Sequence, residues 1–359
     1  NRQDPATKLL QNIFDGININ SLLFSPPSEP YKSIIDYLSS REEERIAPQD
    51  CETRTFIHDI PVVPSFESGS LLDALQQRKA AIVRDRGIVT YGWVSPEQAY
   101  ILYSSVCFAC FVKFFSDFLR DYQMGRDDQH QRQVLGRALS CLDPLPEELP
   151  EDLEHGPFRD RAQMIRAMDQ AGKLVVKYRL VDSFFGNISY LMDDCLYISQ
   201  TSSSLDELIG HIDPCPLDNS SCAGLTASSE LPAHRDILLR TGHLAVLHGH
   251  PKFSVIMSMQ CDKTGTCEQL GECHRRCPET RYVRGFPVVP GEVGSGPFGL
   301  CRTVPHAMES ANGAIVYGHG VFTTGARDFN QALSALLDVE RQCRQEYLRR
   351  VAPAIPSGD

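Results

Sequence analysis

Residues 313–325 read GAIVYGHGVFTTG, and residues 80–92 repeat the pattern as AAIVRDRGIVTYG. Six of the thirteen positions are identical, and two more exchange one apolar residue for another. Each copy begins with a short apolar run, 81–83 or 314–316, which predicts a buried strand followed by a turn. Chance recurrence of a common strand-turn pattern is the alternative explanation, and the flanking sequence distinguishes the two.

The sequence around the two copies matches in further blocks. The residues ETR and PVVP precede the first copy at 52–54 and 61–64, and the second copy at 279–281 and 287–290. Downstream, Gln98-Ala99 matches Gln331-Ala332, and Cys110 matches Cys343 at the same separation. Several shared blocks in one order indicate an internal duplication, with residues 52–125 equivalent to residues 279–350.

The composition is that of a globular protein able to bury a core. The chain has 359 residues, of which 42% are hydrophobic and 23% charged, and its formal net charge is −11. This charge argues against a broad nucleic-acid surface, and no uninterrupted apolar run approaches the roughly 18 residues of a membrane span. The 13 scattered cysteines favour reduced thiols. We therefore expect a cytoplasmic protein that binds neither nucleic acid nor membrane.

The predicted elements form two unequal parts. Residues 127–157 are rich in proline and acidic residues, which is typical of a linker, here with partly helical character. Helices flanking many short strands predict an α/β fold with a mainly antiparallel or mixed sheet. The second part is expected to contain helices at 159–171 and 328–350 and strands at 174–180, 195–199, 245–247, 255–259 and 313–317.

A possible metal site lies at residues 247–251, which read LHGHP. Side chains two apart in a strand project from the same face, so His248 and His250 can reach one metal ion together. His319, in the second copy of the repeat, can supply a third imidazole. Three imidazoles suit Zn²⁺, Mn²⁺, Fe²⁺ or Co²⁺ with a position left for substrate. Taken alone, the pair fits ordinary core or surface histidines as well.

Residues 160–350 carry five short motifs in a distinctive order. They are GNIS at 186–189, YISQTS at 197–202, SSE at 228–230 followed by His234, HGHP at 248–251 and HG at 319–320. In this order the motifs resemble the class II aldolase/adducin superfamily, the fold of fuculose-1-phosphate aldolase and ribulose-5-phosphate 4-epimerase. The resemblance implies a layered α/β fold with a central mixed sheet flanked by helices, partially duplicated in this chain.

The resemblance also implies roles for individual residues. His248, His250 and His319 would hold a divalent metal, Zn²⁺ first, with Mn, Fe or Co as alternatives. Glu230 beside the metal would be the catalytic acid/base. A Lewis-acid metal stabilises the enediolate of retro-aldol cleavage, and a nearby carboxylate can move the proton. Turns of the first half would bind substrate phosphate through Asn187, Thr201, Ser202, Ser228 and Ser229.

Two departures from the family pattern stand out. Ser202 occupies a position where the family has glycine, and its Cβ would narrow the anion pocket. The first copy has Arg86 in place of His319 and has no counterpart of the HGHP and SSE motifs. Alternatively, Arg86 is an anion-binding side chain at a shared active site. The resemblance implies this possibility, because class II aldolases are tetramers with active sites between subunits. This resemblance implies a homo-oligomer.

We therefore expect three segments. Residues 1–126 form a degenerate half-unit without metal ligands, used for packing or regulation. Residues 127–157 form the linker, and residues 158–352 form a complete class II aldolase-like catalytic domain. This domain contains a cysteine-rich insertion at 261–277 that the family lacks. The insertion contains four thiols, those of Cys261, Cys267, Cys273 and Cys277. They could hold a second, structural metal such as zinc, they could hold an iron–sulfur cluster, or they could bind nothing.

The expected function is that of a metal-dependent aldolase, a carbon–carbon lyase. Its substrate would be a small-molecule sugar, a phosphorylated or hydroxylated ketose, cleaved through a metal-stabilised enediolate. A sugar-phosphate epimerase or dehydratase of the same superfamily is one alternative. A non-catalytic, adducin-like assembly protein is another, and the presence of three histidines together with Glu230 argues against it.

Overall fold

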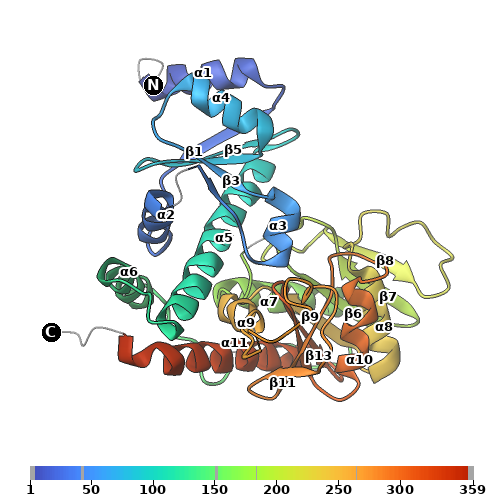
Figure 1. Ribbon diagram of the computed structural model, residues 1–359. Helices are drawn as coiled ribbons and strands as arrows, with labels where there is room; N and C mark the ends of the chain where they lie inside the picture. Colours follow the sequence, from blue (N-terminus) through green and yellow to red (C-terminus); the bar gives the residue numbers. More distant parts are fainter. Residues whose placement is uncertain (1–4, 42–43, 150–152, 183, 264, 355–359) are drawn as a thin grey trace. The chain divides into compact units, whose positions relative to one another are not determined.

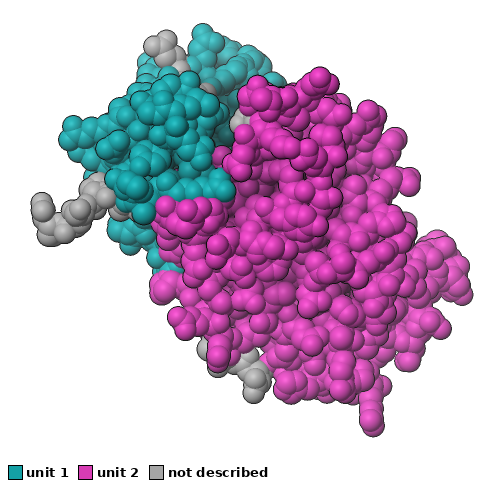
Figure 2. Space-filling view, turned by 60° about the horizontal axis from the view of Figure 1, so that its bottom comes forward, with its two compact units in different colours: residues 1–143, 350–359 teal, residues 144–349 magenta. Residues whose placement is uncertain are grey.

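The computed structural model describes residues 5–41, 44–149, 153–182, 184–263 and 265–354, which fall into two compact units (Figures 1 and 2). Unit 1 comprises residues 1–143 and 350–359, and unit 2 comprises residues 144–349. The division falls within the predicted linker, and the helical part of that linker, α6, belongs to unit 1.

Unit 1 is built on a five-stranded mixed sheet with the order β1-β5-β4-β3-β2. Alternate residues of its central strands, Ala81, Val83 and Val89, join helices α1 and α4 in one core. Helix α5 contacts β5 and β1 from the other face (Figure 1). The elements are α1 (Pro5–Gly16), β1 (Ser21–Ser25), α2 (Tyr31–Arg41), β2 (Arg45–Ile46), α3 (Cys51–Ile57), β3 (Ile60–Val63), α4 (Ser68–Gln77), β4 (Ala80–Val83), β5 (Gly87–Gly92), α5 (Pro96–Gln123) and α6 (Gln129–Ser140).

Helix α5, which contains Cys107-Phe108-Ala109-Cys110, is apolar nearly all round. Within the described part of the chain, α5 is the helix that is long and apolar enough to cross a membrane. Buried core helices of soluble proteins also meet these two criteria. Of its most apolar window, 78% is buried inside the protein, including Cys107, Phe111 and Phe115. A helix that is hydrophobic on all sides needs protein cover on several sides, and α5 has it.

Unit 2 is built on an eight-stranded mixed sheet with the order β10-β11-β12-β13-β9-β6-β7-β8. Val246, Ala314, Val316 and Phe322 pack on one face against α8 and α10. The elements are α7 (Arg161–Lys177), β6 (Asn187–Met192), β7 (Cys195–Ser199), β8 (Ile212–Pro216), α8 (Leu231–Thr241), β9 (Ala245–Gly249), α9 (Lys252–Ser258), β10 (Arg281–Val283), β11 (Phe286–Val289), η1 (Leu300–Arg302), α10 (Val304–Met308), β12 (Gly313–Val316), β13 (Gly320–Gly325) and α11 (Phe329–Val351). The end of α11, from Arg350, and the following η2 (Ala352–Ala354) belong to unit 1.

The two sheets share one strand order over part of their width. In unit 1, β1, β5, β4, β3 and β2 are successive neighbours, and in unit 2, β9, β13, β12, β11 and β10 follow with the same relative directions. The β4–β3 and β12–β11 pairs are parallel, and the other pairs are antiparallel. Val83 pairs with Gly87, as Val316 pairs with Gly320. The repeated sequence therefore corresponds to a repeated structure.

Side-chain hydrogen bonds repeat as well. The Thr90 hydroxyl donates to the carbonyl of Ala99 at 2.7 Å, and the Thr323 hydroxyl donates to the carbonyl of Ala332 at 2.8 Å. Both bonds tie the second strand of the hairpin to the first turn of the following helix, α5 or α11. The helices therefore leave the two sheets at equivalent points.

The correspondence extends to β1, beyond the sequence blocks that repeat. Phe24 opposes Val89 across the β1–β5 pair, and His248 opposes Phe322 across the β9–β13 pair. Because Val89 and Phe322 are equivalent in the repeat, Phe24 occupies the position of His248. Pro26 occupies the position of His250 by the same register, and neither residue can ligate a metal.

Three sequence-based assignments are wrong. The predicted strand at 174–180 continues helix α7 to Lys177, and the predicted strand at 255–259 lies in helix α9. The ETR block is not structurally equivalent in the two copies, because residues 52–54 lie in helix α3 whereas Arg281 begins strand β10. The β2–β3 connection of unit 1 contains this extra helix, and the β10–β11 connection of unit 2 is the two-residue turn Arg284–Gly285.

Candidate active site

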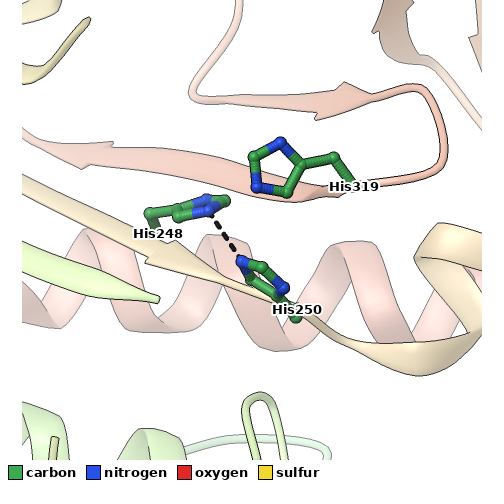
Figure 3. A group of neighbouring side chains, drawn as sticks. All are labelled: His248, His250 and His319. Atoms are coloured by element: carbon green, nitrogen blue, oxygen red, sulfur yellow. Dashed lines mark hydrogen bonds between the residues drawn. The ribbon is translucent and has the colours of Figure 1, made fainter. Parts of the chain in front are cut away.

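Three histidines converge at one edge of the central strands of unit 2 (Figure 3). His248 lies in β9, His250 directly follows the end of this strand, and His319 lies in the turn between β12 and β13 (Figure 3). One ring nitrogen from each histidine lies within 4.8 Å of those of the other two, and all three side chains are buried. The pairing of β9 with β13 brings the turn that carries His319 beside His248 and His250.

The ring of His248 is held in one orientation. Its Nδ1 donates a hydrogen bond to the carbonyl of Val321 at 3.0 Å, which assigns the proton to Nδ1 and leaves Nε2 as an unprotonated nitrogen. That Nε2 lies 2.9 Å from Nε2 of His250. Phe322 stacks on the His248 ring with centroids 4.0 Å apart, and Phe185 stacks on His250 at 5.6 Å.

The electrostatic environment keeps His248 neutral. Burial lowers the pKa of His248 well below its usual value, and the neighbouring rings of His250 and His319 lower this pKa further. A metal ligand must be an unprotonated imidazole, so this environment prepares the nitrogen for a cation. Three buried imidazoles with converging nitrogens fit a divalent metal, which they could bind through nitrogen with a coordination position left over.

Glu230 places its carboxylate against this group from the start of helix α8. Its Oε2 lies 3.3 Å from Nε2 of His248, and its Oε1 lies 3.5 Å from Nε2 of His319. The side-chain amide of Asn187 donates to Oε2 at 2.8 Å, and the backbone N–H of Glu230 donates to the Ser228 hydroxyl at 3.3 Å. The carboxylate is buried and fixed beside the point where the three imidazoles meet.

The remaining predicted substrate-binding residues lie in two adjacent turns. Gln200 forms a β-bridge with Ala227, and the N–H of Thr201 donates to the carbonyl of Thr226 at 2.8 Å. The turn after β7 therefore lies beside the segment that leads into α8. Thr201, Ser202 and Ser229 are exposed, whereas Ser228 and Asn187 are buried. The structure brings Asn187 to Glu230 rather than into these exposed turns.

Ser202 adopts a backbone conformation that is uncommon for a residue with a side chain. Its φ is 61°, in the left-handed region where glycine has no steric penalty. This observation gives a physical reason for glycine at the corresponding position of the family pattern. The serine in this chain keeps the turn at some conformational cost and adds a hydroxyl at an exposed position.

The four cysteines of the insertion are not gathered into a comparable group. The four cysteines all lie in the described part of the chain. In that part, the group of three or more potential ligands within metal-binding reach of one another consists of the three histidines. All four cysteines are reduced thiols and partly buried. A second, structural metal at Cys261, Cys267, Cys273 and Cys277 stays a prediction from their spacing.

Sequence reasoning missed several residues that hold the site in place. Lys252 forms a partly buried ion pair with Asp182 at 2.8 Å, which ties the segment before β6 to the first turn of α9. Glu340 of α11 accepts hydrogen bonds from the backbone N–H groups of Phe253 and Ser254 at 3.0 and 2.9 Å. The adjacency of Lys252 to the HGHP motif was a usable signal for the first contact. Glu340 is distant in sequence from the motif, and no sequence signal pointed to its contact with α9.

His234 is a second buried histidine close to the site but not part of the cluster. Its Nδ1 lies 2.7 Å from the Ser189 hydroxyl, and its Nε2 is buried without a hydrogen-bond partner. Burial lowers the pKa of His234 to about 3. Its ring packs edge-on against Phe322, which in turn stacks on His248. His234 therefore supports the packing behind a predicted ligand.

The close packing around Gly320 gives a testable prediction. A Cβ at this position would lie 2.5 Å from the carbonyl oxygen of Gly249 and 2.8 Å from Cε1 of His248. We expect Gly320→Ala to displace the His248 ring and to weaken metal binding by about tenfold or more, as changes around metal ligands commonly do. Gly265→Ala is the matched control, since its Cβ would meet nothing within 4 Å. Equal zinc affinity of the two variants in a chelator competition assay would contradict the expected crowding.

The second half of the chain matches a known protein family. The family model described as "Class II Aldolase and Adducin N-terminal domain" matches residues 166–347. The chain belongs to this family. No curated protein matches the chain.

Several solved structures resemble about half of the chain. The L-fuculose-1-phosphate aldolase from Thermus thermophilus is 20% identical, with a TM-score of 0.43, and the match covers 55% of this chain and 100% of that one. YgbL from Klebsiella pneumoniae, a putative aldolase/epimerase/decarboxylase, is 21% identical, with a TM-score of 0.40 and coverages of 52% and 90%. A sugar-phosphate aldolase from Thermotoga maritima is 18% identical, with a TM-score of 0.39 and coverages of 55% and 98%.

Proposed function

We propose that the chain is a metal-dependent aldolase, a carbon–carbon lyase that acts on a phosphorylated or hydroxylated ketose. The observation that carries the proposal is the convergence of three buried imidazoles with one buried carboxylate, at distances of 3.3 and 3.5 Å from two of them. This set combines a neutral nitrogen site for a cation with an acid/base group beside it. Membership of the aldolase and adducin family supports the proposal.

His248, His250 and His319 would hold the metal. A neutral set of three nitrogens with an open position is typical of catalytic zinc, and Mn, Fe or Co are the alternatives. When bound, a divalent ion supplies Lewis acidity toward the carbonyl oxygen of the substrate. The stacked Phe322 and the Val321 carbonyl fix the orientation of His248, so the nitrogen set is preorganised.

Glu230 is the residue that moves protons in this proposal. Cleavage of the carbon–carbon bond leaves its electron pair on the carbon next to the carbonyl, and the departing hydroxyl-bearing carbon becomes an aldehyde. A proton must leave that hydroxyl, and another must reach the enediolate carbon. A fixed carboxylate beside the reacting atoms can carry out such transfers. The Asn187 amide, bonded to Oε2, orients the carboxylate.

Substrate phosphate is assigned in this proposal to the two adjacent turns next to Glu230. Thr201, Ser202 and Ser229 are exposed there, and Ser228 lies between the turns and the carboxylate. Hydroxyl and backbone N–H groups can bind a phosphate without adding a charge to the site. Asn187 was assigned to the phosphate as well, but its bond to Glu230 favours a role in orienting the carboxylate.

The test combines metal analysis with product analysis. Purified protein should contain about one equivalent of divalent metal, and incubation with a panel of phosphorylated ketoses should release dihydroxyacetone phosphate from one of them. Epimerised ketose without cleavage would assign the same site to an epimerase, and loss of water would assign it to a dehydratase. Protein without metal and without turnover would support a non-catalytic, adducin-like role.

The same proposal divides the chain into functional parts. Residues 158–352 are the catalytic domain, residues 127–157 are a linker, and residues 1–126 are a degenerate copy of its second half. The shared strand order and register support this division, since Phe24, Pro26 and Arg86 occupy the positions of the three histidines. The first copy therefore lacks every ligand of the proposed metal site.

A further inference from the structure

Unit 1 contains a cavity that the proposed catalytic chemistry does not use. It has a volume of about 580 Å³ and lies among the segment before α3, the end of α3 and the middle of α5. All of its lining residues belong to unit 1. They are Ala47, Pro48, Gln49, Arg54, His58, Asp59 and Lys113.

The charge around this cavity is positive in a chain whose net charge is −11. The cavity is lined by Arg54, Lys113 and Asp59, with His58 as a further basic group. The groups that pair directly with these residues are Arg45 and Arg78 on Asp59, and Asp117 on Lys113. The lining residues and these partners together comprise four cations and two carboxylates, an excess of two positive charges.

Both carboxylates are already engaged by cations. Asp59 accepts hydrogen bonds from Arg78 at 2.9 and 2.8 Å and from Arg45 at 2.6 Å. These hydrogen bonds outweigh the effect of burial and lower the pKa of Asp59. Asp117 accepts from Lys113 at 3.0 Å, from Gln49 at 2.6 Å and from Arg120 at 2.5 Å. Neither carboxylate is left over to neutralise Arg54.

The equivalent place in unit 2 is organised differently. Lys113 of α5 corresponds in the repeat to Glu346 of α11, which pairs with Arg349 at 2.7 Å and with Arg284 at 4.0 Å. Arg284 lies in the two-residue turn that replaces helix α3. Unit 2 therefore satisfies its loop arginine with an internal acid. Unit 1 has a cation at that position and an added helix, α3, that borders the open cavity.

From this contrast we infer that the cavity of unit 1 binds the phosphate group of a small phosphorylated molecule. A phosphate monoester carries nearly two negative charges near neutral pH and several acceptor oxygens. The Arg54 guanidinium can donate to two of these oxygens, and the Lys113 ammonium supplies a point charge from the cavity wall. This site is distinct from the proposed sugar-phosphate site of unit 2, and each of the two proposals can be tested independently of the other.

The test is calorimetric titration of the full-length protein with inorganic phosphate and with glycerol 3-phosphate. Arg54→Gln should weaken binding about tenfold or more, since a hydrogen bond to a charged group is lost. Lys113→Met should have a similar effect, and the affinity should fall as ionic strength rises. Lys32→Met is the matched control, because Lys32 is an exposed lysine of unit 1 that pairs with Asp36 away from the cavity.

Arg54 is exposed, so its replacement tests the inference without endangering the fold. Phosphate bound with unchanged affinity by Arg54→Gln and Lys113→Met would overturn the inference, as would no measurable binding by the unaltered protein. Binding that is lost in His250→Ala but kept in Arg54→Gln would assign the phosphate to unit 2 and also overturn it. Acetate, with a single charge, should bind at least about tenfold more weakly than phosphate.

Discussion

His250→Ala is expected to lose bound metal almost completely while the protein stays folded. His250 is one of three converging imidazoles, and its Nε2 lies 2.9 Å from that of His248. Removing a direct ligand from a three-nitrogen site should cost more affinity than the 10- to 100-fold typical of its outer-shell partners, so we expect a loss above about 100-fold. Turnover should fall in parallel, because the Lewis acid would be absent.

The measurement is metal content after dialysis, by elemental analysis, with circular dichroism as the check on folding. His306→Ala is the matched control, because His306 has a side chain that is 64% exposed and lies outside the cluster. The control should keep its metal. Full metal occupancy in His250→Ala would remove the basis of the site, and so would equal losses in the two variants.

The strand and turn that begin each copy of the repeat could be predicted from the sequence because their signals are local. Short apolar runs bounded by glycine and polar residues gave β4 and β12, and the long closing pattern gave α11 within one residue of its observed bounds, whereas β5 and β13 were not predicted as strands. Since residues in a strand alternate between faces, His248 and His250 were expected side by side. Placement of His319 beside them depends on the β9–β13 pairing, which no local signal shows.

Short buried apolar runs could not be assigned correctly from periodicity. Residues 255–259 read as a strand, but α9 is buried on all sides from Lys252 to Ser258, so its helical period is hidden. Residues 174–180 likewise extend a helix whose predicted end was too early. The ETR block failed for another reason: three matching letters occur in a helix of one copy and at a strand of the other.

The equivalence of β1 and β9 could not be predicted from the sequence. By register, Leu22 to Ser25 correspond to Val246 to Gly249, and within these segments only Leu23 and Leu247 are identical. Tertiary pairing therefore preserves a relation that side-chain identity has lost. The same comparison places Phe24, Pro26 and Arg86 at the positions of His248, His250 and His319. This register supports the proposal that unit 1 holds no metal better than the missing motifs alone.

Glu230→Gln is expected to lower kcat by about 100-fold or more with a much smaller change in KM. The substitution keeps the size of the side chain and leaves an oxygen that can accept the hydrogen bond from Asn187, now made to Oε2 at 2.8 Å. It removes the group that can gain and lose a proton, and general acid–base catalysis typically contributes about 10²–10⁴-fold. A fall in kcat without a matching rise in KM would show that the lost interaction belongs to the transition state.

Metal content has to be measured on the same Glu230→Gln sample, since the carboxylate lies 3.3 Å from Nε2 of His248 and could also influence the cation. Metal retained with turnover lost would assign the carboxylate to proton transfer, whereas loss of both would assign it to metal retention. Glu309→Gln is the control, because Glu309 is an exposed glutamate that pairs with Arg240 away from the histidines. An unchanged kcat in Glu230→Gln, on a substrate that the unaltered protein cleaves, would mean that another group moves the proton. The preorganised contact between Asn187 and Glu230 would then serve the stability of the site rather than its chemistry.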